Sequence, residues 1–169
     1  MFARHFIDSL DFARRGLELR GEIALSEMPR LQDMLASPEG VVSYVLRGVQ
    51  GKHGEPLLEL QLQGLCQLRC QRCLQALPYA IGTVSLLMPV PEGGLEAAQA
   101  EGGELEEEDE VDRIPADAHL DVQALIEDEI LLGLPFSPRH EFGVCEPAVG
   151  SAPAEEQNPF AVLRGLKKQ

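Results

Sequence analysis

The chain has no tryptophan, and aromatic residues make up 5% of its 169 residues. Its core must therefore consist mainly of leucine, valine, isoleucine and alanine, which the hydrophobic content of 44% supplies. No stretch approaches the roughly 20 apolar residues that a bilayer span needs. Residues 1–20 have neither an apolar run nor a small-residue cleavage site, which argues against a signal peptide. We therefore expect a cytoplasmic protein with one folded domain.

The motifs of common enzyme classes are missing from the sequence as well. It contains no P-loop, no dinucleotide-binding glycine pattern and no Ser/His/Asp arrangement. Glu127 and Glu129 are available for acid/base chemistry, but they lie on a predicted helix face where charges are usually solvated, and no nucleophile accompanies them. A zinc-dependent nuclease needs an open metal position and a base, which the sequence does not display. We expect no enzymatic activity and no small-molecule substrate.

Basic residues are scarce, with 14 Lys and Arg against 28 Asp and Glu and a net charge of −14. Ten of the acidic residues fall between Glu92 and Asp112, where no basic residue occurs. RNA binding requires Lys and Arg, so tight unaided binding to RNA is not expected. We predict that residues 91–112 form a disordered acidic loop. It serves solubility or, alternatively, competes with phosphates for a Lys/Arg-rich partner such as a ribosomal protein.

Alternating hydrophobicity predicts an α+β fold with an antiparallel meander sheet of about four strands. In the third strand, even-numbered residues from Leu58 to Cys70 are mainly apolar and share one face, and polar residues share the other. The sheet therefore has one apolar face, which helices must cover. The predicted strands span residues 17–25, 41–50, 57–69 and 77–90.

Two helices are predicted within this domain. Ser26 provides an N-cap for a short helix ending near Ala36, and Asp121 caps a helix over 122–133 that we expect to cover the sheet. Residues 1–145 thus form a single domain. A Pro- and Ala-containing linker over 146–157 follows it.

Residues 158–169 are predicted to form a short C-terminal docking helix, opened by Asn158 and an N1 proline. So short an amphipathic helix is not stable alone. It either folds back onto the domain or docks in a groove of a partner. The side chains expected to make that contact are Phe160, Leu163, Leu166, Lys167 and Lys168.

The soft metal ligands of the chain cluster in two places, Cys70-Gln71-Arg72-Cys73 and His140 with Cys145. Cys70, Cys73, His140 and Cys145 are able to form a Cys3His zinc site, because a C-x-x-C turn presents two sulfurs together. The alternative is that Cys70 caps the apolar row and the other three are dispersed. A redox role fits less well, because strands rather than a helix N-terminus flank the motif. Cys66 lies in the inward row and is expected to pack as a small hydrophobe.

Four segments in this order resemble the bacterial YceD family, the large ribosomal RNA subunit accumulation proteins. They are Cys-Gln-Arg-Cys-Leu at 70–74, the acidic helix ending in Leu-Pro at 122–135, the Pro-x-His segment with its following cysteine at 138–145, and Asn-Pro-Phe-Ala-Val-Leu at 158–163. The resemblance covers most of the chain. In members that have a second downstream C-x-x-C, the resemblance implies zinc binding more strongly; this chain has His140 and Cys145 instead.

The resemblance implies a non-enzymatic accessory factor in large ribosomal subunit biogenesis, which supports synthesis, processing or stability of 23S rRNA. Its implied partners are large-subunit ribosomal proteins or pre-50S assembly intermediates, with rRNA contacted directly or indirectly, and no membrane. An alternative is a direct RNA-binding module or a zinc-stabilised binding protein that acts on rRNA. The basic residues available for RNA contact are Arg69, Arg72, Arg139, Arg164, Lys167 and Lys168.

Overall fold

The protein is represented by a computed structural model, which describes residues 5–91 and 111–145. Most of the predicted acidic loop lies outside these residues. So do the predicted linker over 146–157 and the predicted docking helix over 158–169, including Phe160, Leu163, Leu166, Lys167 and Lys168.

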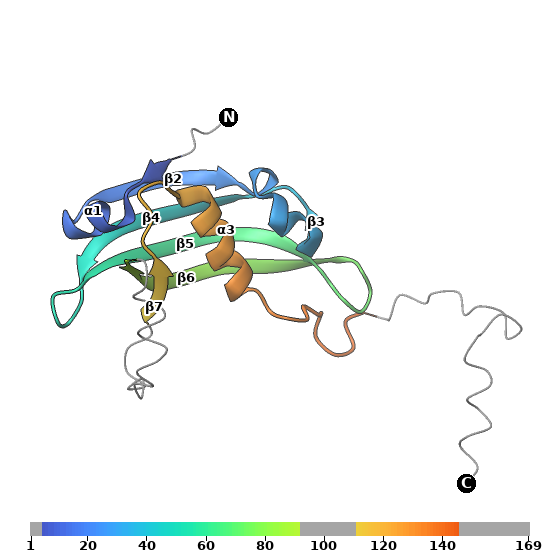
Figure 1. The fold of residues 1–169 in the computed structure, drawn as a ribbon. Coiled ribbons are helices and arrows are strands. Elements are labelled where there is room, and N and C mark those ends of the chain that lie inside the picture. Colours follow the sequence, from blue (N-terminus) through green and yellow to red (C-terminus); the bar gives the residue numbers. More distant parts are fainter. Residues whose placement is uncertain (1–4, 92–110, 146–169) are drawn as a thin grey trace, which may run out of the picture.

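One large sheet dominates the described part of the chain (Figure 1). Its strands run in the order β2-β4-β5-β6-β7, and β3 pairs separately with β5. A small second sheet joins β1 to β8. The strands of the large sheet are β2 (Glu18–Ala24), β3 (Leu35–Ser37), β4 (Val41–Gln50), β5 (Pro56–Arg69), β6 (Ala76–Val90) and β7 (Val111–Pro115); those of the small sheet are β1 (Phe6–Ile7) and β8 (Leu120–Asp121).

The predicted α+β class is confirmed, and β2, β4, β5 and β6 pair antiparallel in the predicted succession. The prediction of a purely antiparallel sheet of about four strands is wrong. The large sheet has six strands and is mixed, because β7 pairs parallel with β6. Residues 91–110 separate these two strands along the chain, a length that a parallel return requires. Val111 and Asp112, predicted to lie in the acidic loop, belong to β7.

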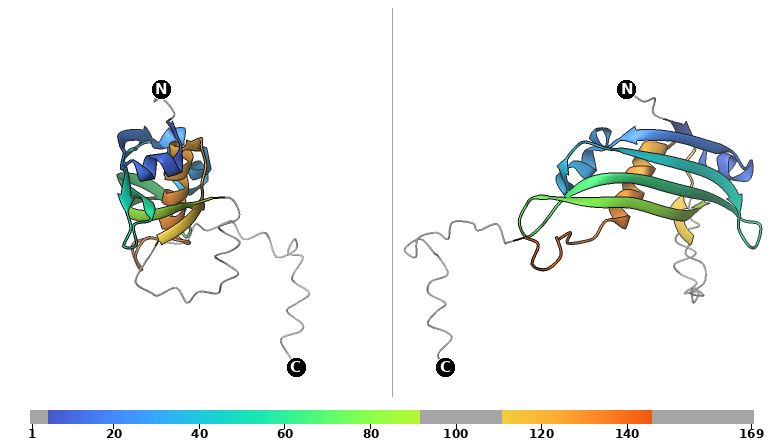
Figure 2. Two further views of the ribbon diagram at one scale, coloured as in Figure 1. Left: turned by 60° about the vertical axis from the view of Figure 1, so that its left-hand side comes forward. Right: turned by 180° about the vertical axis from the view of Figure 1, so that it is seen from behind.

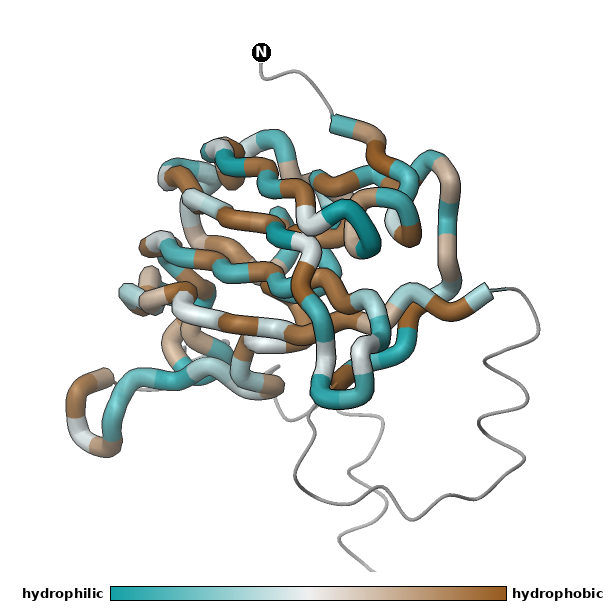
Figure 3. The backbone as a smooth tube through the Cα atoms, turned by 90° about the vertical axis from the view of Figure 1, so that its left-hand side faces the viewer, coloured by the Kyte–Doolittle hydropathy of each residue, from teal (hydrophilic) through white to brown (hydrophobic). Residues whose placement is uncertain are grey.

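The two faces of the sheet differ as the sequence pattern predicts. Hydrophobic and hydrophilic residues alternate along the strands (Figure 3). On β5 the inward row is buried and joins one core cluster with residues from β4, β6 and the helices. Burial raises the pKa of the Cys66 thiol, so Cys66 packs as predicted. The buried members of this row on β5 are Leu58, Leu60, Leu62, Cys66 and Leu68.

Helix α3 (Val122–Gly133) crosses one face of the sheet (Figure 2). The Asp121 carboxylate caps it by accepting hydrogen bonds from the backbone N–H groups of Gln123 and Ala124. Its apolar side enters the core through Val122, Ile126 and Ile130. The shorter helix α1 (Ser9–Arg14) packs beside the far end of the same face. Neither described helix is long and apolar enough to cross a bilayer.

The predicted helix from Ser26 to Ala36 is wrong in kind. Two 3₁₀ helices, η1 (Leu25–Glu27) and η2 (Pro29–Met34), occupy the region, and β3 begins at Leu35. Neither has a side-chain N-cap, so Ser26 does not cap a helix. Met28 lies between the two short helices and Pro29 opens the second one; a proline lacks the N–H that a continuous helix would use.

The view that Glu127 and Glu129 are solvated is also wrong, because both are buried. The Glu127 carboxylate accepts hydrogen bonds from the backbone N–H of Arg30 at 2.6 Å and of Leu31 at 3.2 Å, and from Arg30 Nε at 2.9 Å. Glu129 accepts one from the Ser85 hydroxyl. These carboxylates therefore connect α3 to η2 and β6, and Glu127 replaces the missing cap of η2.

Candidate metal centre

The first half of the centre is the turn between β5 and β6. The backbone N–H of Cys70 donates to the carbonyl of Gln75 at 2.9 Å, and that of Leu74 donates to the carbonyl of Cys70 at 2.8 Å. Leu74 has a φ of 63°, in the left-handed region that branched residues such as leucine rarely adopt. The turn thereby brings Cys70 and Cys73 to the same side, as the C-x-x-C spacing predicts.

The second half is the irregular segment 134–145 that follows α3. It lies against the turn through Gln71, whose backbone N–H donates to the carbonyl of Pro138 at 2.9 Å. The Gln71 side chain also donates to the carbonyl of Phe136 and accepts from the Ser137 hydroxyl. We call residues 70–75 together with 136–145 the cysteine knuckle. These contacts place the downstream segment beside the two cysteines.

The knuckle brings together all four predicted ligands, Cys70, Cys73, His140 and Cys145, with their ligand atoms within 4.8 Å of one another. Cys70 Sγ lies 4.0 Å from Cys145 Sγ, and Cys73 Sγ lies 3.4 Å from His140 Nδ1. Tetrahedral Zn²⁺, with its usual bond lengths, places two sulfurs about 3.8 Å apart and a sulfur and a nitrogen about 3.6 Å apart. The donor set and these two distances fit a bound zinc ion.

The orientation of His140 supports the same chemistry. Its Nε2 lies 3.1 Å from the carbonyl oxygen of Ala76. A carbonyl only accepts, so this contact places the imidazole proton on Nε2 and leaves the lone pair of Nδ1 facing the sulfurs. Metal-binding histidines are commonly held in this way by a hydrogen bond from the other ring nitrogen. The group is therefore able to bind a metal ion without rearranging the imidazole.

The surroundings of two of the three sulfurs, those of Cys70 and Cys145, favour thiolates. Cys70 is buried, which opposes ionisation, but backbone groups of Cys73, His140 and Arg72 lower the pKa of its thiol to about 5. Burial likewise opposes ionisation of Cys145, and the Arg72 guanidinium outweighs it and lowers the pKa of that thiol. Metals bind the thiolate form, so both effects favour coordination.

Arg72 lies inside the C-x-x-C motif and points at the second half of the centre. Its Nε and Nη2 lie 3.3 and 3.1 Å from Cys145 Sγ, and Nη2 also donates to the carbonyl of Glu141 at 3.3 Å. The guanidinium therefore places a positive charge beside the most C-terminal ligand. Sequence reasoning named Arg72 for RNA contact and missed this role, because a contact across 73 residues leaves no local pattern.

The knuckle also exposes two phenylalanines that sequence reasoning did not single out. Phe136 is 98% exposed and Phe142 is 99% exposed. Both lie in a region with prolines at 135 and 138 and no hydrophobic periodicity. The sequence around each phenylalanine lacks the hydrophobic periodicity of a strand or helix, and this could have predicted that the two rings lie outside the core.

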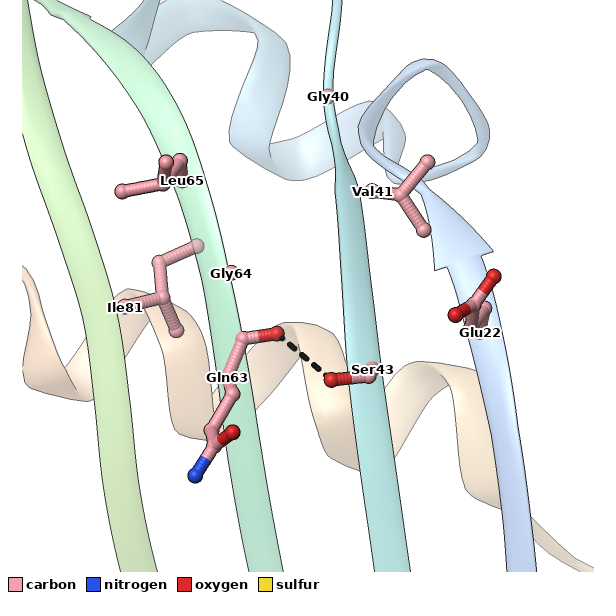
Figure 4. A pocket seen from close by; sticks show the side chains of 8 residues that line it. All are labelled: Glu22, Gly40, Val41, Ser43, Gln63, Gly64, Leu65 and Ile81. Carbon is pink, nitrogen blue, oxygen red and sulfur yellow. Dashed lines mark hydrogen bonds between the residues drawn. The ribbon is translucent and has the colours of Figure 1, made fainter.

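A shallow depression lies on the opposite face of the sheet. It lies where β4 and β5 face away from α3 (Figure 4), and Ser43 Oγ donates to the carbonyl of Gln63 across it at 3.1 Å. Among its lining residues Glu22 is the one ionisable side chain. It has no convergent set of reactive groups comparable to the knuckle. Its lining residues are Glu22, Gly40, Val41, Ser43, Gln63, Gly64, Leu65 and Ile81.

Comparison with known proteins gives a family and a relative. The family model for the large ribosomal RNA subunit accumulation protein YceD matches residues 58–167, more than half of the chain and the whole of the knuckle. A protein of that name from Haemophilus influenzae is similar to the chain, with 25% identity over 171 residues, covering 96% of this chain and 95% of the relative. No solved structure matches the chain.

Proposed function

The chain belongs to the YceD family of large ribosomal RNA subunit accumulation proteins, and from this premise we propose that it is a non-enzymatic, cytoplasmic accessory factor in large ribosomal subunit biogenesis. It supports synthesis, processing or stability of 23S rRNA. The names of the family and of the relative from H. influenzae support the connection with the large subunit and its RNA. The proposal adds that the protein acts by binding a partner and not by catalysis.

The observation that carries the binding role is the composition of the knuckle. Four protein ligands, Cys70, Cys73, His140 and Cys145, satisfy the tetrahedral coordination of zinc. Catalytic zinc sites have three protein ligands and leave the fourth position to water or substrate. A Cys3His site is closed in this sense. We therefore assign these four residues to a structural Zn²⁺ ion that holds the downstream segment against the β5–β6 turn.

In this function the partner is a large-subunit ribosomal protein or a pre-50S assembly intermediate. A chain with a net charge of −14 is electrostatically suited to basic partners, as ribosomal proteins commonly are. The acidic residues of 91–112 and the C-terminal residues Phe160, Leu163, Leu166, Lys167 and Lys168 are the proposed contacts.

Metal analysis tests the zinc assignment directly. The intact protein, purified without chelator, should contain close to one equivalent of zinc, since structural zinc is bound tightly. Cys73→Ser removes a ligand and should lose the metal. Cys66→Ala is the matched control, because it removes a thiol that packs in the core outside the knuckle, and it should keep the metal. A native zinc content below about 0.2 equivalents contradicts the assignment.

The proposed partners are tested by affinity purification from cells. The intact protein should co-purify large-subunit ribosomal proteins or immature large subunits. A version that ends at Gln157 should lose part of this material, because it lacks the docking residues. Depletion of the protein should lower 23S rRNA relative to 16S rRNA. Recovery of no ribosomal component, together with unchanged 23S rRNA, contradicts the proposed function.

A further inference from the structure

Two fully exposed aromatic rings are unusual in a chain with six phenylalanines. Phe136 and Phe142 expose 98% and 99% of their surface. Exposure this high means that neither ring packs against the other or against the rest of the described chain. Each therefore offers an aromatic face to solvent on which a flat ligand can stack.

The knuckle holds the backbone on both sides of these rings. The carbonyl of Phe136 accepts from Gln71 Nε2, and the carbonyl of Glu141, which precedes Phe142, accepts from Arg72 Nη2. Both anchors come from adjacent residues of the C-x-x-C turn. The backbone that carries the two rings is therefore held at two points against the C-x-x-C turn.

Two exposed arginines lie in the knuckle or next to it in the chain. Arg139 lies between the two phenylalanines in the chain, is exposed, and donates from Nε to the Ser137 hydroxyl. Arg69, the residue before the knuckle, is also exposed and donates to the carbonyl of Leu35. Glu141 is the one acidic residue of the knuckle. A surface with arginines and one carboxylate contrasts with a chain whose net charge is −14.

We propose that the cysteine knuckle binds single-stranded RNA, with Phe136 and Phe142 as stacking platforms for two unpaired bases and Arg139 as a phosphate contact. The inference rests on the proposed function. It adds the residues through which the protein would contact RNA. Proteins that bind single strands combine exposed aromatic side chains with a few cations. A protein-binding hot spot is instead a contiguous, well-packed apolar patch, which two separate, fully exposed rings do not form.

Base stacking and the net negative charge of the chain together predict how RNA binding depends on salt and on RNA structure. Stacking on each ring supplies most of the affinity, whereas the acidic chain opposes accumulation of phosphates. The dependence on salt should therefore be shallow, with about one or two counterions released. Duplex RNA should bind poorly, because its bases are stacked on one another and are not available to the rings.

The test uses the full-length, zinc-loaded protein and an unstructured RNA of about ten nucleotides, a length within the usual site size of such modules. Phe136→Ala and Phe142→Ala should each weaken binding about tenfold, the effect of losing one stacked base. Phe6→Ala is the matched control, because Phe6 is also more than half exposed but lies on β1 outside the knuckle. It should leave binding unchanged.

A second pair of variants separates stacking from general hydrophobic contact. Phe136→Leu and Phe142→Leu keep an apolar side chain and remove the aromatic face, so they should bind RNA as poorly as the alanine variants. The tryptophan variants should bind at least as well as the native protein. Arg139→Ala should reduce the salt slope by about one unit. Zinc content is measured for every variant and should not change.

Several outcomes overturn the inference. They are no measurable binding of the single strand, alanine variants that bind as tightly as the native protein, or leucine variants that bind RNA normally but lose a ribosomal protein in pull-downs, which would identify a protein contact. The proposed function is judged separately. If Phe136→Ala/Phe142→Ala still co-purifies with large-subunit components and restores 23S rRNA levels, the RNA contact is wrong and the accessory role stands.

Discussion

Two sets of contacts, which we call joints, connect α3 and the segment after it to earlier parts of the chain. They differ in the chemistry of the groups that meet. At one, the buried Glu127 carboxylate accepts the backbone N–H groups of Arg30 and Leu31 and forms an ion pair with the Arg30 guanidinium. We call this the carboxylate joint. At the other, the cysteine knuckle, three thiols and an imidazole converge with one guanidinium beside them.

The difference indicates which joint needs a ligand. In the carboxylate joint the backbone N–H groups of Arg30 and Leu31 have an acceptor, and the Arg30 guanidinium pairs with the carboxylates of Glu127 and Asp128. In the knuckle three sulfurs converge, with the Arg72 guanidinium beside Cys145 and one imidazole beside Cys73. A bound metal cation would stabilise this arrangement, because sulfur and imidazole ligands coordinate it together. The knuckle is therefore the joint at which we expect a bound metal ion.

Metal removal should give the largest difference between the joints. Zinc present at 1,000 times its dissociation constant stabilises the folded protein by about 4 kcal/mol, and this stabilisation is lost when a chelator is added. In hydrogen exchange, amides of residues 136–145 should become unprotected. The amides of Arg30 and Leu31 should stay protected, because the carboxylate joint holds no metal. Equal protection of 136–145 with and without chelator contradicts this expectation.

Loss of the Glu127 carboxylate should have the next largest effect. Glu127→Ala leaves buried N–H groups of η2 without an acceptor and should lower the free energy of unfolding by about 3 kcal/mol. Chemical denaturation measures this. Asp128→Ala is the matched control, because Asp128 also pairs with Arg30 but is half exposed, and it should cost less than about 1 kcal/mol. Both variants should bind zinc normally, and a loss of zinc from Glu127→Ala would show that the joints are not independent.

Replacement of Arg72 probes the knuckle without removing a ligand. Arg72→Ala should weaken zinc binding about 10- to 100-fold, the usual effect of removing a partner that orients a metal ligand. Competition against a chromophoric chelator measures the affinity. Arg72→Lys keeps the charge but loses the fork that reaches both Cys145 and Glu141, so it should restore part of the loss. Arg69→Ala should have no effect, and an equal loss from it would point to net charge instead.

The smallest effect is expected at the turn that carries the first two ligands. Leu74 holds a left-handed backbone at a cost of about 1–2 kcal/mol, and its side chain is largely exposed. Leu74→Gly should remove this cost and, after the added chain entropy of glycine, stabilise the protein by about 0.5–1 kcal/mol. Leu74→Ala removes the side chain and keeps the strain, so it should gain nothing. Equal stability of the two variants would show that the turn is not strained.

Part of the fold and of the centre was predictable because it depends on neighbours in the chain. The alternation over 41–50 predicts β4 with the bounds it has, and Asp121 predicts the start of α3. The turn at Cys70 and Cys73 follows from two strands joined by a short connection. In each case the controlling interactions span a few residues, so the local pattern contains them.

What the amino-acid sequence determined by itself was periodicity, caps and turns, and hence most strands, one long helix and the pair of cysteines. The tertiary structure alone decided the parallel pairing of β7, the burial of Glu127, the exposure of Phe136 and the approach of His140 and Cys145 to the turn. The physical reason is distance along the chain. Contacts such as Glu127 with Arg30 or Arg72 with Cys145 join residues 97 and 73 positions apart, and only the folded sheet brings them together.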